Sequence, residues 1–206
     1  IGTRMLVHLR DQGLLGSNVT FIHMNVVHPE DVPLIAQTGV RVVWCPYGQL
    51  QMIGRSGAQG RMIELSRAGV AVGIGSDIPR VTHVQSLGTL AVGCAGATGN
   101  PASGREIMRM RTIGAAATVG AESMVGSIEV GKRADLVIRK ADASEHLSLD
   151  RSLELGVIAG SDSIACVIVN GRIVVQNGEL LAADTPSILA RARLSTRHML
   201  ERIKLS

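Results

Sequence analysis

A short apolar run between Ala71 and Gly75 leads to the carboxylate of Asp77. In parallel α/β folds, a buried strand can place an acid at the mouth of a site, where the carboxylate binds a metal or accepts a proton. Asp is also a favoured helix N-cap, so this acid fits either a reactive group or the start of the next helix. A second β-rich run, Val19–Ile22, ends in the same way on His23. These two side chains are therefore the first candidates for chemistry.

Strands and helices alternate over the first half of the sequence, and they must position these two side chains. Gly or Pro marks the switches from one element to the next. Such an alternation predicts βαβ units and a parallel sheet, with too few strands to close a barrel of eight. The expected strands are Val19–Ile22, Val40–Trp44 and Val70–Gly75; the expected helices cover 3–12, 29–38, 61–68, 84–92 and 104–117, with a loop over 45–60.

The pattern changes near Gly120, where β-branched runs follow one another closely. The dipeptide Asn170-Gly171 between two such runs predicts a tight hairpin, because both turn positions need a positive φ. The second half is therefore expected to form a small, mostly antiparallel sheet followed by a helix over 185–204. The expected strands are Ser127–Val130, Asp135–Arg139, Ile164–Val169 and Arg172–Val175.

Composition excludes several classes of protein. Of the 206 residues, 46% are hydrophobic and 18% charged, as in a folded globular protein. The apolar runs fall short of the ~18 residues that span a bilayer and no signal peptide is recognisable, so we expect a cytoplasmic protein without a membrane partner. The basic residues behind the net charge of +4 are scattered, and one Phe, one Tyr and one Trp offer little stacking surface, which argues against a nucleic-acid partner. The three separated cysteines fit neither a disulfide framework nor a thiolate zinc site.

One segment of the second half identifies a family. Residues 124–137, MVGSIEVGKRADLV, closely resemble the G-x-I-x-x-G-x-x-A-D-L-V block of the amidohydrolase superfamily, in its cytosine deaminase and chlorotriazine hydrolase branch. Residues 112–120 resemble the helix before this block, and 166–178 resemble the hairpin that closes it. The same segment is close to a phosphate-binding loop, but Arg133 stands where that loop needs a hydroxyl, so we reject a nucleotide site. The resemblance covers about residues 15–180.

The resemblance implies an α/β fold, the C-terminal part of a (β/α)8 metal-dependent hydrolase barrel plus part of a flanking β-sandwich. Residues 1–120 would carry barrel strands six to eight, 121–182 the C-terminal share of the sandwich, and 183–206 a C-terminal helix. The family's other metal-binding histidines, on the first strand and around the fifth, have no counterpart here. The chain begins with Ile1 as if in mid-helix, so we expect it to be part of a longer protein.

The resemblance also assigns roles to the two strand-end side chains. Asp77 falls where the family has the Asp of a Thr-Asp-Gly motif, and would bind one divalent metal, zinc or iron, and accept a proton from the attacking water. His23 falls where the family has a strand ending in histidine, and would stabilise the tetrahedral intermediate by a hydrogen bond. The implied reaction is hydrolysis at a carbon of a ring or amide, with loss of an amine or another leaving group.

Two loops depart from the family pattern, and both are expected near the substrate. Trp44 and Tyr47, in a loop that departs from His-Cys-Pro-x-Ser-Asn, offer aromatic surfaces for a flat ring. Arg80 follows Asp77 in the second loop and could pair with an anionic substrate, and His83 stands where relatives carry a substrate-facing Asn. These residues are the predicted substrate contacts.

Two functional classes remain open from the sequence. The first is a metal-dependent hydrolase of carbon–nitrogen bonds, acting on a small aminated heterocycle or cyclic amide and self-associating into a homo-oligomer. The second is an incomplete, non-catalytic barrel half that depends on a partner segment for the missing histidine ligands. Metal content and the sequence upstream of Ile1 would distinguish them.

Overall fold

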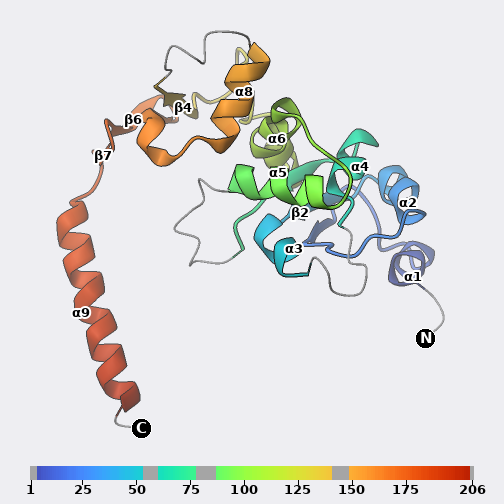
Figure 1. The fold of residues 1–206 in the computed structure, drawn as a ribbon, viewed down its shortest axis with the longest axis horizontal. Helices are drawn as coiled ribbons and strands as arrows, with labels where there is room; N and C mark the ends of the chain where they lie inside the picture. Colours follow the sequence, from blue (N-terminus) through green and yellow to red (C-terminus); the bar gives the residue numbers. More distant parts are fainter. Residues whose placement is uncertain (1–3, 53–59, 78–86, 141–148, 205–206) are drawn as a thin grey trace. The chain divides into compact units, whose positions relative to one another are not determined.

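The computed structural model describes residues 4–52, 60–77, 87–140 and 149–204 (Figure 1). The chain divides into two compact units, which are described one at a time. The first unit comprises residues 1–133 and 141–161, and the second comprises 134–140 and 162–206. No helix in the described ranges is both long and apolar enough to cross a membrane.

The first unit contains a parallel sheet of three strands in the order β1-β2-β3. The strands are β1 (Thr20–Ile22), β2 (Arg41–Trp44) and β3 (Val72–Ile74). Val42 of β2 lies opposite Phe21 of β1 and Val72 of β3, so the three strands run in register. The predicted parallel arrangement of these strands is confirmed.

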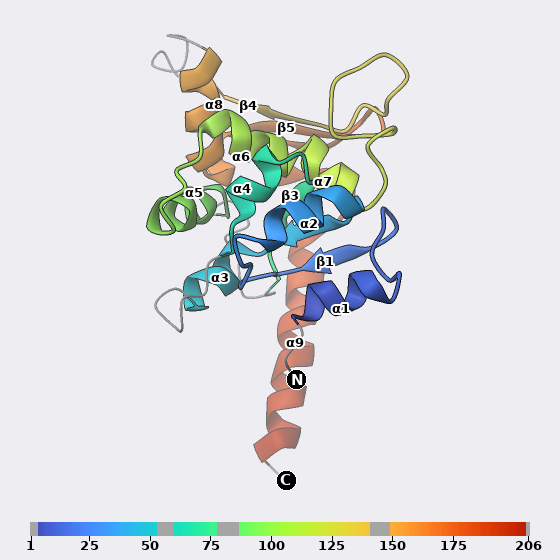
Figure 2. The same cartoon turned by 90° about the vertical axis from the view of Figure 1, so that its right-hand side faces the viewer.

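Helices surround this sheet (Figure 2). Two of them, α2 and α4, lie on the crossovers that parallel strands require. Gly39 follows α2 with φ 73°, a left-handed conformation that glycine adopts without penalty, and it ends the helix as the sequence predicts. The helices of the first unit are α1 (Met5–Asp11), α2 (Asp31–Thr38), α3 (Pro46–Met52), α4 (Met62–Arg67), α5 (Leu87–Ala97), α6 (Gly104–Arg111), α7 (Ile113–Thr118) and α8 (Leu149–Ile158).

The two faces of the sheet are covered differently. Val42 and Trp44 of β2 are buried in the main core, whereas the alternate residue Val43 is only half-buried. Helix α7 covers part of the second face, and the approach is so close that a Cβ on Gly73 would lie 2.7 Å from Cα of Ala115. A glycine in β3 is therefore needed for α7 to pack on the sheet.

Three expectations for the first unit are corrected. Residues 46–52, expected in a loop, form α3, which begins at Pro46, a residue suited to the first helical turn. The single helix expected over 104–117 is divided into α6 and α7 at Thr112, whose backbone is not helical (φ −121°, ψ −103°). Residues 127–130 form turns and irregular backbone instead of a strand, and Ile128 is 87% exposed. β-branched composition without a neighbouring strand to pair with did not produce a strand there.

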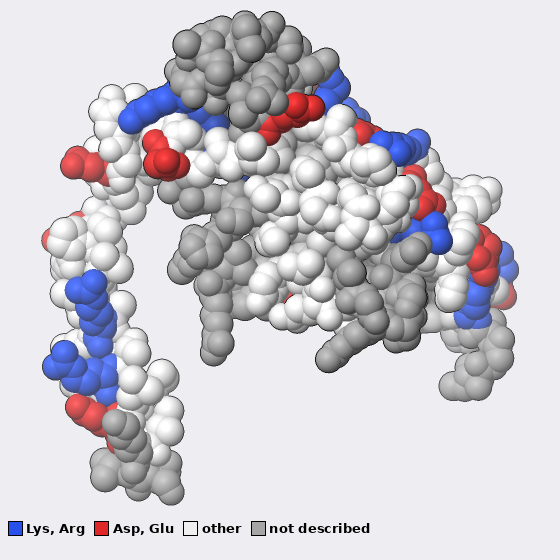
Figure 3. All heavy atoms as spheres, in the orientation of Figure 1, with Lys and Arg blue, Asp and Glu red and all other residues white. Residues whose placement is uncertain are grey.

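The second unit contains an antiparallel sheet in the order β4-β5-β6-β7, followed by a long helix. The Asn170-Gly171 turn joins β5 to β6 with φ values of 49° and 78°, which confirms the predicted hairpin. The helix α9 is exposed along its length, and basic side chains lie along its visible face (Figure 3). The elements are β4 (Leu136–Arg139), β5 (Ile164–Val169), β6 (Arg172–Gln176), β7 (Glu179–Leu180) and α9 (Thr185–Lys204).

Candidate active site

The structure brings His23 and Asp77 together at one edge of the parallel sheet. His23 follows β1 and Asp77 follows β3, so β2 lies between the strands that carry them. Nε2 of His23 lies 3.7 Å from Oδ1 of Asp77, and the two side chains are 39% and 36% exposed. The carboxyl ends of parallel strands form the edge at which α/β proteins bind ligands. The distance leaves two polar groups facing one accessible space without a direct hydrogen bond.

The backbone at this edge is strained. His23, Met24 and Asp77 have φ values of 72°, 43° and 61°, in the left-handed region that disfavours side chains. The other described non-glycine residues with positive φ, Asn170 and Asn177, are asparagines, which tolerate this conformation best. Each strained residue costs about 1–3 kcal/mol, and such residues concentrate at functional sites. The strain therefore marks the same edge as the side-chain chemistry.

Backbone hydrogen bonds to β2 fix the two chain segments that lead into the candidate site. The backbone N–H of His23 donates to the carbonyl of Val43 at 2.9 Å, which extends the β1–β2 ladder by one residue. The N–H of Gly75 donates to the carbonyl of Trp44 at 2.8 Å on the other side of β2. The central strand thus fixes both ends of the candidate site.

A buried thiol lies beside the pair. Cys45 follows β2, as His23 follows β1, and its side chain is buried and free. Burial and then the negative charge of Asp77 raise the pKa of this thiol, while the backbone N–H of His23 lowers it. Sequence reasoning excluded a disulfide framework and a thiolate zinc site for the cysteines, and it missed the nearness of Cys45 to His23 and Asp77. Its position at a strand end was the available signal.

Helix α3 lies over the imidazole of His23. A Cβ added to Gly48 of α3 would lie 3.2 Å from Nδ1 of His23, so the helix backbone is almost in contact with the ring. Nδ1 is buried and has no hydrogen-bond partner among the described residues, and the same holds for Oδ1 of Asn25 nearby in the chain. The imidazole therefore has one covered nitrogen, while the other faces Asp77.

The other predicted substrate contacts are placed differently. Trp44 is 1% exposed, and its Nε1–H donates to Oε1 of Gln49 at 2.5 Å. A ring so covered offers no face to a ligand, so we do not propose Trp44 as a substrate contact. Tyr47 is half-buried on α3, next to Gly48. Arg80 and His83 lie outside the described residues.

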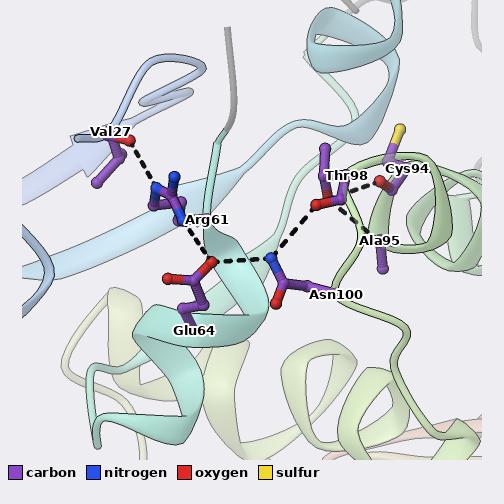
Figure 4. Close-up of polar contacts among 7 residues, drawn as sticks. All are labelled: Val27, Arg61, Glu64, Cys94, Ala95, Thr98 and Asn100. Carbon is purple, nitrogen blue, oxygen red and sulfur yellow. Dashed lines mark hydrogen bonds and ion pairs between the residues drawn. The ribbon is translucent and has the colours of Figure 1, made fainter. Parts of the chain in front are cut away.

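The loop after β1 is anchored by a polar network (Figure 4). Nε of Arg61 donates to the carbonyl of Val27 at 3.1 Å, and its NH1 group contacts Oε1 of Glu64 at 2.7 Å. The same carboxylate oxygen accepts from Nδ2 of Asn100 at 2.8 Å. Glu64 thus links α4 to the far end of the His23 loop and to the segment between α5 and α6. Sequence reasoning did not find this network, because Val27 lies 34 residues before Arg61 and Asn100 lies 36 residues after Glu64.

A divalent metal can be tested against the side chains present. The carboxylate of Asp77 is partly exposed and is a suitable ligand for zinc or iron. No group of three or more His, Cys, Asp or Glu side chains is arranged for a metal within the described ranges. The side chains present therefore fit one part of a metal site, with Asp77 as one possible ligand.

Comparisons with known proteins agree with this fold. Residues 3–174 match the amidohydrolase family. A protein of Symbiobacterium thermophilum named 5-methylthioadenosine/S-adenosylhomocysteine deaminase is 34% identical over 93% of this chain and 45% of its own length. One of the same name from Desulforudis audaxviator is 27% identical over 98% of this chain and 48% of its own.

Solved structures give the same picture. An adenosine deaminase from Xanthomonas campestris with bound zinc matches 100% of this chain and 47% of its own, with a TM-score of 0.84 and 30% identity. The zinc complex of an atrazine chlorohydrolase from Arthrobacter aurescens matches 94% of this chain and 44% of its own, with a TM-score of 0.73 and 25% identity. This chain therefore spans just under half the length of these relatives. From the extent of the family match, the chain belongs to the amidohydrolase family.

Proposed function

We propose that the full-length protein is a metal-dependent hydrolase that deaminates an aminated heterocycle. The observation that carries the proposal is the facing pair of His23 and Asp77 at the carboxyl ends of β1 and β3, on strained backbone. The names of the relatives favour a ring of the adenine type as the substrate. In the reaction, water adds to the ring carbon that bears the amino group, the carbon–nitrogen bond breaks, and ammonia leaves.

The two side chains have complementary roles in this proposal. Asp77 provides one carboxylate ligand to the metal, zinc or iron, and a carboxylate oxygen that takes a proton from the attacking water. When bound, such a metal lowers the pKa of a water molecule towards neutrality. Nε2 of His23 faces the same space and hydrogen-bonds to the group on the attacked carbon, where charge develops. The 3.7 Å separation keeps each group free to act on the substrate.

Substrate contacts follow from the loops at this edge. We propose that Tyr47 packs against the heterocycle, because its ring is half-buried on the helix that covers His23. Arg80 and His83 keep their predicted substrate roles, since the structure does not describe them.

The test uses the full-length protein, purified with its metal. We expect ammonia release from adenosine-type substrates, and a loss of kcat of at least ~100-fold for Asp77→Asn, which removes the proton acceptor, and for His23→Asn, which removes the hydrogen bond where charge develops. Metal analysis should show one divalent ion per wild-type chain and a reduced content only in the Asp77 variant. A fully metal-loaded wild type that releases no ammonia from any aminated heterocycle would overturn the proposal.

A further inference from the structure

Residues outside the reacting groups fix the orientation of His23. The ring has two nitrogens, of which Nδ1 is buried below Gly48 and Nε2 lies 3.7 Å from Asp77. The position of α3 therefore decides where Nε2 is directed. Any contact that holds this helix in place also holds the imidazole.

A buried hydrogen bond ties α3 to the central strand. Trp44 is the last residue of β2, and its indole N–H donates to Gln49 of α3 at 2.5 Å. The two side chains are 1% and 2% exposed, so water is excluded from the bond. An unpaired donor or acceptor would be costly at such a place, which keeps the partners together.

Two further features of the structure involve the same helix. The thiol of Cys94 on α5 donates to the carbonyl of Pro46, the first residue of α3, at 3.4 Å. A Cβ on Gly60 would lie 3.3 Å from both the carboxamide of Gln49 and the carbonyl of Met24. The Gln49 side chain thus lies against the same backbone position as the residue that follows His23. Gln49 therefore lies near both segments that border the imidazole, α3 and the chain after His23.

We propose that Trp44 and Gln49 are positioning residues: their hydrogen bond holds α3, through Gly48, against the imidazole of His23 and directs Nε2 toward Asp77 and the substrate. The catalytic consequence rests on the function proposed above. The effect on the orientation of the His23 ring does not depend on that function, and it is measured separately.

The first experiment removes the bond in the full-length, metal-loaded protein. Trp44→Phe deletes the donor, Gln49→Met deletes the acceptor, and the double variant leaves neither group unpaired. We expect each single variant to lower kcat about 10-fold or more with KM within about twofold and unchanged metal content. The double variant should recover thermal stability but not kcat. Recovery of both would show that the bond only stabilises the fold, and would overturn the proposal.

The second experiment moves the ring while favouring the helix. Gly48→Ala places a methyl group 3.2 Å from Nδ1 of His23, so the imidazole must shift. Alanine favours the helix relative to glycine, so we expect a lower kcat without a lower melting temperature. The matched control for Gln49→Met of the first experiment is Gln51→Met. It makes the same substitution at an exposed position of α3, and its kcat should stay at the wild-type value. Unchanged kcat in Gly48→Ala would contradict the positioning role.

A spectroscopic readout separates this proposal from the proposed function. The imidazole ¹H and ¹⁵N signals of His23, assigned by their loss in His23→Asn, should shift in Trp44→Phe, Gln49→Met and Gly48→Ala and remain in place in Gln51→Met. If the wild type does not deaminate but these signals shift, the proposed function fails and the positioning role stands. If the signals stay in place in all variants, the positioning role fails.

Discussion

At the scale of single residues, the candidate site combines side chains that sequence reasoning could find with a geometry that it could not. His23 and Asp77 stand at the ends of apolar runs, and that position is readable from the sequence. Their left-handed backbone is not, because histidine and aspartate, although enriched at positive φ among non-glycine residues, adopt negative φ far more often. The closeness of Gly48 to the imidazole was equally hidden, because it depends on a helix that was expected to be a loop.

The three thiols differ in exposure, and alkylation should follow that order. Cys45 and Cys94 are buried, whereas Cys166 is half-buried. Burial raises the pKa of Cys94 to about 11, and burial together with Asp77 raises the pKa of Cys45, so both have little reactive thiolate at neutral pH. We expect iodoacetamide at pH 8 to modify Cys166 first, with the other two reacting only after unfolding in guanidinium. Peptide mass spectrometry gives the order, and rapid labelling of Cys45 in the native protein would contradict the burial described here.

At the scale of elements, apolar periodicity predicted the strands better than it predicted how helices end or break. The sequence of the 45–60 region is rich in Gly, Ser and Gln, and Pro46 at the first helical position is a weak local signal for α3. The helix depends on tertiary contacts, among them the Trp44–Gln49 bond. Residues 127–130 show the opposite case, in which β-forming residues lack a strand partner in the part of the chain that the structure describes.

The packing of α7 on β3 predicts a large effect of one methyl group. In Gly73→Ala the new Cβ would lie 2.7 Å from Cα of Ala115, where the backbone cannot give way freely. We expect a loss of about 1–3 kcal/mol in the free energy of unfolding, as for other overpacked cores. Gly93→Ala is the control, because nothing lies within 4 Å of its Cβ position on α5, and alanine there should gain about 0.5–1 kcal/mol. Equal urea midpoints for the two variants would argue against the close packing of α7.

The N-terminus of α6 predicts a stability that depends on pH. Ser103 and Glu106 form a reciprocal capping box, and the guanidinium of Arg67 donates to Glu106 at 2.8 Å. Hydrogen bonds first from Arg67 and then from Ser103 lower the pKa of Glu106 from 4.5 to about 2. Because the pKa is depressed in the folded state, this stabilisation is complete above pH 4.5 and is lost as the pH falls towards 2.

The variant Glu106→Gln tests this dependence. At pH 6 we expect it to be about 1 kcal/mol less stable than wild type, since it lacks the charge that Arg67 and the helix N-terminus favour. The difference should shrink between pH 4.5 and pH 2, as measured by urea unfolding. A difference that stays constant over that range would mean that the carboxylate does not carry the effect.

At the scale of the whole molecule, the chain has the fold of its relatives over just under half of their length. The outer strand β1 pairs only with β2 in the sheet described here, and its Ile22 is 62% exposed. The barrel, the sandwich and self-association stay predictions for the full-length protein. The family could be recognised from residues 124–137 alone, because that block combines fixed glycines with an Ala-Asp-Leu-Val run, whereas the substrate could not, because the loops that contact it depart from the family pattern.

Metal content should distinguish the half-length chain from the longer protein. The described residues lack a group of three ligand-type side chains, so we expect a protein of these 206 residues alone to hold less than one zinc or iron per chain. In the full-length protein we expect stoichiometric metal, measured in the same way by elemental analysis after gel filtration. Stoichiometric metal in the short protein would mean that its own residues complete the site.

The covered nitrogen of His23 limits the direction from which this imidazole can be reached. Nδ1 is enclosed beneath Gly48, and only Nε2 opens toward Asp77. His23 therefore offers one hydrogen-bonding atom on one side. A molecule that contacts this imidazole must approach beside the carboxylate of Asp77, so a group that pairs with Nε2 must also be tolerated next to a negative charge.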